Sequence, residues 1–332
     1  MIILIGLLHI LIWSQVIDAK LLGNQFYENT LSSRLGLQDI GSRNLLIPLN
    51  VTRNPGSVES QEIQKFISNH FKQLNNPWIF EPDCFIERDL EFCNLVFTLG
   101  RNASNYLVLA AHYDSKILPE GFIGAIDSAA SCSVLLYVSE FLDTFFGSLT
   151  ESMESTGLAS VFDEFDGIKV VFFDGEEALD QWTTNDSIYG AKHLAARWKK
   201  SGILDSIGLL ILLDLLGSRE DVKVPSYFSQ SDLVYNSLLA TETLHQNELP
   251  HKKTLFDRDD LRFLKSNRIV IEDDHLPFLA CNISVLHLIP LPFPSYWHTL
   301  GDTFDEVDER KVQNWAILLC EYVASHVIPT TE

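Results

Sequence analysis

Basic residues are scarce in this sequence. Its 332 residues include 24 lysines and arginines against 45 aspartates and glutamates, which gives a formal net charge of -21 at pH 7. Such a chain would repel nucleic acids and anionic membrane surfaces, so polyanionic partners are excluded. The acidic excess lies in segments such as 151–166 and 302–309. Charge runs of this kind are usually solvated, and we interpret both segments as exposed surface.

The chain also has few cysteines, and no pair has the spacing of a zinc clamp. There are five cysteines, an odd number, so they cannot all pair within one chain. Cys84 and Cys93 flank a short segment and can bridge a hairpin. The other three, Cys132, Cys281 and Cys320, are interpreted as buried small apolar residues.

Apart from its N-terminus, the chain lacks long apolar runs. Residues 1–19 are apolar but short for a bilayer span, and no lysine or arginine precedes the run. We interpret 1–19 as a signal peptide that is cleaved after Ala19, which predicts a secreted protein with one domain at 20–332. An uncleaved anchor that holds a lumenal domain is the alternative. Later segments lack the length to cross a membrane, since 207–216 is short and contains Asp214.

Four Asn-x-Ser/Thr sequons are compatible with passage through the secretory pathway. They lie at Asn50, Asn102, Asn185 and Asn282. We expect Asn50 and Asn102 to be accessible for glycosylation. Asn282 is the least favourable of the four, because it leads directly into an apolar strand.

The apolar pattern predicts one large α/β domain. With 46% hydrophobic residues, the chain can bury a large core. After an amphipathic helix and two strands, helices and strands alternate along the chain. This alternation predicts a mostly parallel, mixed and twisted sheet with helices on both faces. The expected helices are 63–74, 127–146, 189–200, 232–248 and 308–327, and the expected strands are 84–99, 106–111, 168–173, 207–213 and 284–289.

Polar side chains follow four of these strands at the point where each ends. In open α/β sheets, ligands bind beyond the carboxyl ends of the strands. We therefore expect these side chains to converge at one edge of the sheet. They are His112 and Asp114 after the strand at 106–111, Asp174, Glu176 and Glu177 after 168–173, Asp214 after 207–213, and Trp297 and His298 after 284–289.

Glu176 and Glu177 are the most informative of these residues. Neighbouring glutamates point in different directions, so one can hold a metal while the other carries a proton, as in metal-dependent amide chemistry. A solvated helix start is the simpler interpretation of the pair taken alone, because acidic residues favour the positive end of a helix dipole.

The chain offers a set of side chains that zinc accepts, although it has no HExxH motif. The set is His112, Asp127, Glu177 and His298. Asp127 is equally well interpreted as the N-cap of a helix. His112 also fits a hydrogen-bonded residue beside the sheet, and His298 a polar tip of an aromatic loop.

The remaining histidines and aromatic residues carry weaker signals. We assign no function to His245 and His251, and we expect His287 to be a hydrogen-bonded core residue. Trp182 and the aromatic residues at 293–297 are typical of a core, but their polar, proline-containing surroundings also fit a pocket wall.

Seven motifs occur in a fixed order along the chain. They are LAAHYDSK at 109–116, GAIDSA at 124–129, FFDGEEA at 172–178, SIYGAKHLA at 187–195, LLDLLG at 212–217, DDHLPFL at 273–279 and HLIPLPFPSYWHTLGD at 287–302. From about residue 63 to the C-terminus, the sequence resembles the glutaminyl-peptide cyclotransferase (glutaminyl cyclase) family, a relative of the M28-type zinc aminopeptidases. The tryptophan five positions after the glutamate pair and the PFPxxWHT loop are features of the cyclases.

The resemblance implies a zinc-aminopeptidase-like fold with one catalytic zinc per chain. It implies that the zinc is bound by Asp127, Glu177 and His298. It further implies that Glu176 is the general acid/base. Asp214 and Asp273 would belong to the hydrogen-bond network that supports proton transfer, and the pocket for the N-terminal glutamine would be lined by Trp182, Phe293 and Trp297.

The implied reaction converts the N-terminal glutamine of a peptide to pyroglutamate and releases ammonia. Zinc polarises the carbonyl of the γ-carboxamide, and the α-amino nitrogen of the same residue attacks it. Glu176 takes a proton from that nitrogen and returns it to the departing ammonia. The pocket has to hold a ring-closing conformation and exclude water. N-terminal glutamate is expected to be a poor second substrate.

The chain departs from the family pattern in three places. Ala111 replaces a cysteine that, in secreted mammalian members, pairs with one at the position of Cys132, so this bridge cannot form. Glu272, in the substrate site, stands where glutamine is usual and adds a charge next to Asp273. The loop 116–122 is short. These differences concern the entrance and the pH optimum rather than the reaction.

Two other functions remain open at this point. A secreted two-zinc aminopeptidase is the main alternative, because His112 and Asp214 supply the extra ligands that such enzymes use. A non-catalytic ectodomain that binds a partner is the other. For the cyclase, we expect peptide or protein substrates with N-terminal glutamine, no nucleic acid, no membrane after signal cleavage, and a monomer.

Overall fold

The computed structural model describes residues 24–38, 41, 43–100, 103–156, 167–257 and 271–327. Three predictions fall elsewhere in the chain. The signal peptide at 1–19, the sequon at Asn102 and the side chains of the acidic segment 151–166 lie outside the described part of the structure.

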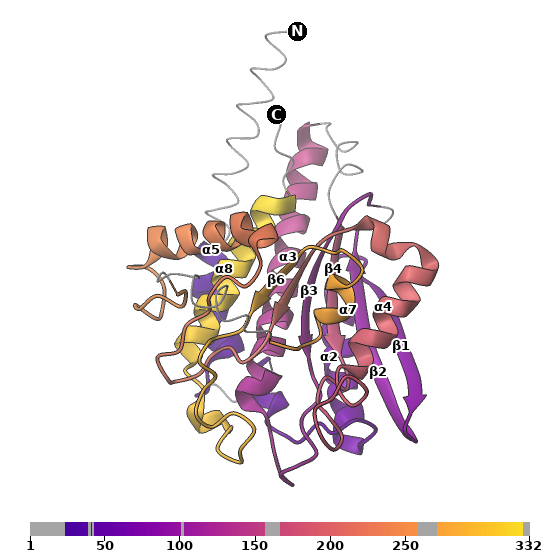
Figure 1. Cartoon of the computed structure of the whole chain (residues 1–332). Helices are drawn as coiled ribbons and strands as arrows, with labels where there is room; N and C mark the ends of the chain where they lie inside the picture. Colours follow the sequence, from indigo (N-terminus) through magenta and orange to yellow (C-terminus); the bar gives the residue numbers. More distant parts are fainter. Residues whose placement is uncertain are drawn as a thin grey trace.

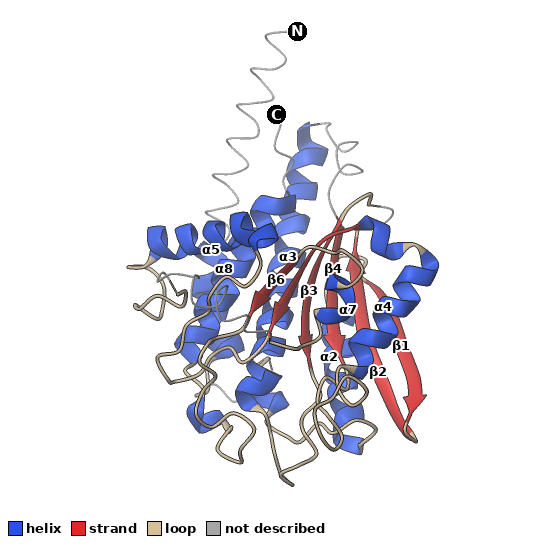
Figure 2. Ribbon diagram, viewed as in Figure 1, coloured by secondary structure: helices blue, strands red, loops and turns tan. Residues whose placement is uncertain are grey.

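A six-stranded sheet forms the centre of the fold (Figure 2). Its strands are β1 (Ile79–Glu87), β2 (Leu90–Leu99), β3 (Tyr106–His112), β4 (Gly167–Phe173), β5 (Ile207–Leu213) and β6 (Val285–Leu288). They lie in the order β1-β2-β4-β3-β5-β6. Strands β4, β3, β5 and β6 are parallel, whereas β2 is antiparallel to both of its neighbours, β1 and β4. The predicted mixed, mostly parallel sheet is confirmed.

Helices cover both faces of this sheet, as predicted (Figure 1). Helices α2, α3 and α8 pack on one face, and α4 and α7 pack on the other. All residues of β3 and β4 are buried, because both faces of these central strands are covered. The helices are residues 24–35, α2 (Val58–Lys72), α3 (Ala130–Thr156), α4 (Tyr189–Ser201), α5 (Asp232–His245), α7 (Leu276–Leu279) and α8 (Glu309–Val327). Shorter turns are η1 (Ile47–Leu49), η2 (Ala125–Ala129), η4 (Ile203–Ser206), η5 (Ser229–Ser231) and η6 (Phe304–Glu306).

The segment expected to form one strand at 84–99 is part of a hairpin. The chain turns at Arg88 and Asp89, whose φ angles are 51° and 62°. Cys84 lies opposite Cys93 in the register of β1 and β2, and the two form a disulfide. The predicted bridge is therefore confirmed, while the single strand is wrong.

One helix has the length and composition of a membrane span. It covers Ala125–Ser148, and 94% of its apolar window is buried inside the protein. No such segment was expected after the N-terminus, and this helix resembles a membrane span by length and composition only. Its burial against the sheet identifies it as a core helix.

Candidate active site

The strand ends bring the predicted polar residues together at one edge of the sheet. Asp127, Glu177 and His298 each place one oxygen or nitrogen within 4.8 Å of the others. His298 Nε2 lies 3.4 Å from Asp127 Oδ2 and 3.4 Å from Glu177 Oε1. Both oxygens are buried, and neither has a hydrogen bond within the described part of the chain. Two such oxygens and an imidazole nitrogen around one point are a donor set that fits zinc.

Asp127 lies in the turn η2, directly before α3. The turn begins at Gly124, with φ at +62°, where an added Cβ would lie 2.0 Å from the carbonyl oxygen of Asp127. The N–H of the preceding residue, Ile126, donates to Asp302 Oδ1 at 2.9 Å. The backbone of Asp127 is not helical, and its carboxylate contacts His112 Nε2 at 3.1 Å. Its interpretation as a helix N-cap is therefore wrong.

Arg53 supports the same turn and was missed by the sequence analysis. Its guanidinium is fully buried and donates to the carbonyl oxygens of Tyr113 at 2.6 Å, Ile123 at 2.7 Å and Gly124 at 3.1 Å. These bonds fix the backbone on both sides of the site. Arg53 also donates to the nearby carbonyl oxygens of Leu49 at 3.0 Å and Val51 at 2.9 Å. The bonds that reach the site join it to backbone groups 60–71 residues away, and no motif in the sequence marks these.

Glu176 and Glu177 lie in a loop, and the next helix begins only at Tyr189. Asp114 holds this loop, because its two carboxylate oxygens accept the N–H groups of Glu176 at 3.1 Å and of Glu177 at 3.2 Å. Both glutamate side chains are buried. The interpretation of the pair as a solvated helix start is therefore wrong.

Burial and neighbouring charges shift the proton affinities of the site. Burial raises the pKa of Glu176 well above its usual range, and the charge of Glu177 raises it further, against the opposing effect of His112. Burial would lower the pKa of His298, but Asp127 and Glu177 outweigh this effect and raise it to about 9. A carboxyl group with a raised pKa can hold and release a proton near neutral pH, as a general acid/base must.

A second set of candidate ligands shares Asp127 with the first. His112, Asp127 and Asp214 also place ligand atoms within 4.8 Å of one another. His112 Nε2 lies 3.4 Å from Asp214 Oδ1, which also accepts hydrogen bonds from Ser128 Oγ and from the N–H of Leu215. These contacts fit both interpretations of His112, as a hydrogen-bonded residue beside the sheet and as a ligand of a second metal.

Asp273 is fully buried near these residues. Its carboxylate contacts His287 Nε2 at 2.6 Å and accepts the N–H of Asp274 at 2.6 Å. Burial raises the pKa of Asp273, and the charge of Asp214 adds to the effect. His287 is the hydrogen-bonded core residue that was predicted. With His275, these two residues form a third group of possible ligands, in which all three side chains are buried.

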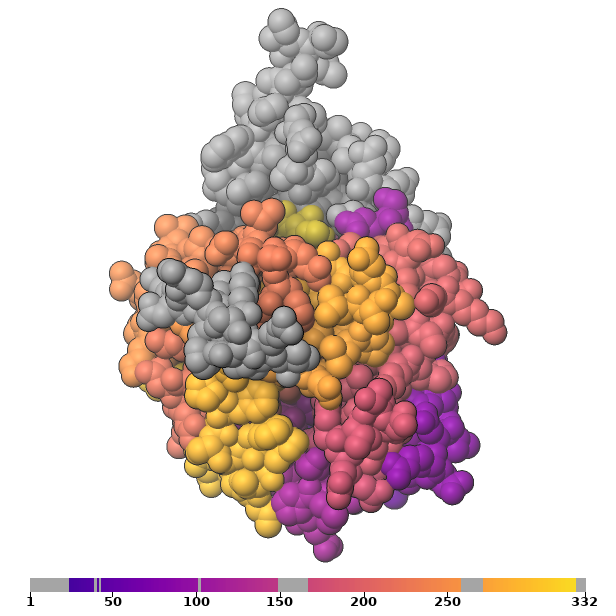
Figure 3. All heavy atoms as spheres, in the orientation of Figure 1, coloured from indigo at the N-terminus to yellow at the C-terminus, as the bar shows by residue number. Residues whose placement is uncertain are grey.

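A cavity of about 710 Å³ opens onto the first ligand set. The segments that carry its lining meet around a hollow on the face shown in Figure 3. Its lining residues are Lys116, Asp127, Glu176, Gln181, Trp182, Asp214, Leu215, Ile271, Glu272, Ile289, Leu291, Phe293, Trp297 and His298. The list includes all four residues predicted to bind substrate.

The aromatic residues form part of the cavity wall. Trp297 stacks on the ring of His298 with centroids 3.8 Å apart, and Phe293 meets Trp297 edge-on at 4.8 Å. Trp182 lies on another segment, and its indole N–H donates to Glu272 Oε2 at 2.8 Å. Trp182, Phe293 and Trp297 thus line the cavity, and Trp182 and Phe293 also pack against the hydrophobic core, so the two interpretations of these residues apply together.

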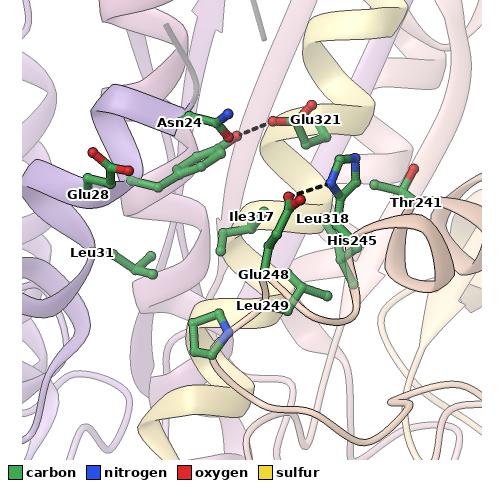
Figure 4. Close-up of a pocket in the computed structure, with 12 residues that line it drawn as sticks. Asn24, Glu28, Leu31, Thr241, His245, Glu248, Leu249, Ile317, Leu318 and Glu321 are labelled. Atoms are coloured by element: carbon green, nitrogen blue, oxygen red, sulfur yellow. Dashed lines mark hydrogen bonds and ion pairs between the residues drawn. The ribbon is translucent and has the colours of Figure 1, made fainter. Parts of the chain in front are cut away.

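A second cavity, of about 340 Å³, lies between the helix at 24–35, the C-terminal end of α5 and α8 (Figure 4). Glu28, His245, Glu248 and Glu321 are among its lining residues, together with leucine and isoleucine side chains. None of the predicted site residues lines it. The predicted site residues therefore gather at the larger cavity and not at this one.

The free cysteine near the site agrees with the expected loss of one disulfide. Cys132 is buried and unbridged, and its Sγ lies 3.1 Å from the carbonyl oxygen of His112. Cys320 is also buried, while Cys281 is partly exposed.

Comparisons with known proteins agree with this geometry. The profile of peptidase family M28 matches residues 94–323. A glutaminyl-peptide cyclotransferase of Drosophila melanogaster is 36% identical over 319 residues, which cover 92% of this chain and 84% of that protein. An uncharacterized protein of Saccharomyces cerevisiae is 44% identical over 346 residues, which cover 96% of this chain and 95% of that protein. The crystal structure of Macrostomum lignano glutaminyl cyclase matches with a TM-score of 0.70 and 31% identity, covering 84% of this chain and 86% of that one.

Proposed function

Because the chain belongs to the glutaminyl-peptide cyclotransferase family within peptidase family M28, we propose that it cyclises the N-terminal glutamine of peptides and proteins to pyroglutamate, with zinc as its cofactor. One observation carries this proposal. The donor set of Asp127, Glu177 and His298 lies at a cavity with aromatic residues in its wall, and Glu176 lines the same cavity.

We assign the binding of one zinc ion per chain to Asp127, Glu177 and His298. Their unpaired buried oxygens and the nearby imidazole nitrogen support this assignment. Bound zinc supplies Lewis acidity toward the carbonyl oxygen of the substrate γ-carboxamide. Lys116 Nζ lies 3.1 Å from Glu177 Oε2 and offsets part of the negative charge on this side of the cavity.

Glu176 is the proposed general acid/base. It accepts a proton from the attacking α-amino nitrogen and donates it to the leaving ammonia, so that the carboxyl group returns to its starting state. Its raised pKa supports both halves of this cycle. Asp214 and Asp273 act on the surrounding hydrogen-bond network, in which His112 and His287 are the partners of these carboxylates.

The wall of Trp182, Phe293 and Trp297 holds the glutamine side chain and excludes water. Nucleophile and electrophile belong to the same residue, so the pocket accelerates the reaction by holding the conformation in which they meet. Competing hydrolysis of the carboxamide requires a water molecule at the position that the α-amino group takes. An aromatic wall disfavours that water.

The N-terminal features support a secreted enzyme. We propose that residues 1–19 act as a signal peptide and that 20–332 form the mature catalytic domain, which works as a monomer. Glycosylation is proposed at Asn50 and Asn102. Asn50 is exposed, as are Asn185 and Asn282 in the two other sequons.

The decisive experiment is to incubate the purified protein with a peptide that begins with glutamine. Release of ammonia and loss of the free amino terminus are followed together, with and without a chelator. We expect both signals to appear at equal rates and to stop when the chelator is added. If neither signal appears with the zinc-loaded protein, the proposed activity is wrong.

A two-zinc aminopeptidase is the second candidate, because His112, Asp127 and Asp214 form a complete second donor set. It predicts two tightly bound zinc ions per chain and release of free amino acids from peptides. Metal analysis of the purified protein, combined with amino acid analysis of the products, separates this candidate from the cyclase.

A further inference from the structure

The substrate cavity changes in character between its floor and its rim. Glu176 and Asp127 are buried, whereas Glu272 and Trp297 are exposed to solvent. When the N-terminal residue of a peptide reaches the buried carboxylates, the second residue of the peptide therefore lies beside Glu272 and Trp297. The side chains at the rim therefore contact the second residue of the substrate.

Glu272 is held in place at this rim. Its Oε2 accepts the indole N–H of Trp182 at 2.8 Å, which fixes the carboxylate against the aromatic wall. The other oxygen, Oε1, has no hydrogen bond to the described residues. A negatively charged group is thus directed to the mouth of the cavity with one oxygen open to a ligand.

The described cations near the cavity form no ion pair with this carboxylate. Lys116, the one lysine or arginine in the described lining, is paired with Glu177 at 3.1 Å. Burial lowers the pKa of Lys192, whereas the charge of Glu272 acts to raise it, so the two side chains are near each other. The Nζ of Lys192, however, donates hydrogen bonds to the carbonyl oxygens of Thr184 at 2.5 Å and Ser187 at 2.6 Å. Among the described residues, Glu272 has no ion-pair partner.

We propose that Glu272 selects substrates with a basic residue directly after the N-terminal glutamine. The inference rests on the proposed cyclase function and specifies its substrate class. The carboxylate attracts a lysine or arginine side chain and repels an aspartate or glutamate. At contact distance in water, one such pair of charges changes binding by about fivefold, and salt weakens the effect.

The test compares three peptides that differ only in their second residue, Gln-Arg, Gln-Ala and Gln-Glu, each extended by the same neutral sequence. Glu272→Gln removes the charge but keeps an oxygen that can accept the Trp182 N–H. Glu28→Gln, in the second cavity (Figure 4), removes the same charge elsewhere. In the wild type, we expect kcat/KM to be about 25-fold higher for Gln-Arg than for Gln-Glu at low salt, because a fivefold attraction and a fivefold repulsion combine. The ratio should approach one in Glu272→Gln, stay unchanged in Glu28→Gln, and shrink for the wild type in about 0.5 M salt.

Two results overturn the inference while leaving the cyclase intact. One is equal turnover of the three peptides by the wild type, and the other is an unchanged ratio in Glu272→Gln. Absence of turnover with every peptide contradicts the cyclase function itself. The proposed selectivity, which rests on that function, is then also wrong.

Discussion

Two neighbouring glutamates have different surroundings, and this difference separates their proposed roles. Glu177 lies beside basic side chains, with Lys116 Nζ at 3.1 Å and the imidazole nitrogen Nε2 of His298 at 3.4 Å. Glu176 is influenced by its burial and by the charges of Asp273 and Asp274, which raise its pKa. A carboxylate oxygen directed at an imidazole nitrogen suits a metal site, and a carboxyl group with raised pKa suits a proton carrier.

Replacing Glu176 with glutamine tests the proton-transfer role. The amide has nearly the same shape but cannot accept a proton, so we expect kcat for a Gln-peptide to fall by about 10²–10⁴-fold. Zinc content and thermal stability should stay near those of the wild type, because Glu176 is outside the proposed ligand set. Activity within a few fold of the wild type would exclude Glu176 as the general acid/base.

The raised pKa of Glu176 also predicts a pH dependence. The protonated form cannot accept the amino proton, so kcat falls as the pH drops through this raised pKa. The acidic limb of the profile should therefore lie above the usual range of a glutamate. Asp273→Asn removes one of the charges that raise the pKa, and we expect it to move this limb to lower pH. A limb that stays in place in the variant would assign the titration to another group, such as the α-amino group of the substrate.

The sequence predicted which residues approach the site better than how they are held. Asp127, Glu177 and His298 were identified from strand ends and motifs. Arg53 and Asp302 were not, although each holds the backbone around Asp127. Within the site, their partners are main-chain groups 71 residues away for Arg53 and 176 for Asp302, and such contacts leave no periodic or local signal. The prediction that 302–309 is exposed surface is wrong for Asp302, which is buried.

At the scale of structural elements, one carboxylate organises the loop that carries Trp182. Asp186 accepts the N–H groups of Leu179 at 2.9 Å, Asp180 at 3.0 Å and Gln181 at 3.1 Å. Partial burial would raise its pKa, but these bonds and one from a tyrosine hydroxyl hold the pKa below its usual range. The tip of the β1-β2 hairpin also reaches this carboxylate, through a guanidinium 2.9 Å away. The position of Trp182 in the cavity thus depends on a residue that does not line it.

Asp186→Ala should therefore impair substrate binding more than chemistry. The loop loses three backbone hydrogen bonds to a charged acceptor, and we expect KM to rise about tenfold while kcat changes less. Asp186→Asn is the matched variant, because its amide oxygen retains part of the acceptor function and should restore KM partly. Equal losses of kcat in both variants, with unchanged KM, would contradict this positioning role.

The disulfide closes the same hairpin, with a sequence separation of 9 between Cys84 and Cys93. Cross-linking a loop of this length stabilises a fold by about 2–3 kcal/mol in the chain-entropy model. Replacing both cysteines with serine should lower the free energy of unfolding by this amount in denaturant titrations. Cys281→Ser is the control, since this cysteine is unbridged and partly exposed. Equal effects of the two changes would show that the bridge contributes little.

The helices and strands were predicted less evenly than the class of the sheet that they build. The alternating segments after residue 167 match the observed β4 to α8 closely. The hairpin was read as one strand because its turn, at Arg88 and Asp89, contains no glycine or proline despite positive φ angles. The helix at 24–35 was not predicted at all. Its Tyr27 is buried and donates a hydrogen bond to Glu321 on α8. This contact joins the two ends of the chain and leaves no local pattern in the sequence.

At the scale of the whole molecule, the site is the point where distant segments of the chain meet. The proposed zinc ligands come from the turn before α3, the loop after β4 and the loop after β6. Their carboxylates are buried, and burying a charge is costly even where a basic side chain lies nearby. A cation at this point would therefore stabilise the fold as well as the reaction, because the unfolded chain does not bring the ligands together.

Removal of the metal should accordingly lower the melting temperature. A ligand present at about 1,000 times its dissociation constant stabilises a protein by about 4 kcal/mol, which corresponds to about 6 °C for a chain of this size. We expect a chelator to cause a decrease of this order, and added zinc to reverse it. In Asp127→Asn, one charged ligand is lost, so the chelator should change the melting temperature far less than in the wild type. A chelator that leaves the wild-type melting temperature unchanged would show that no bound metal connects these three segments.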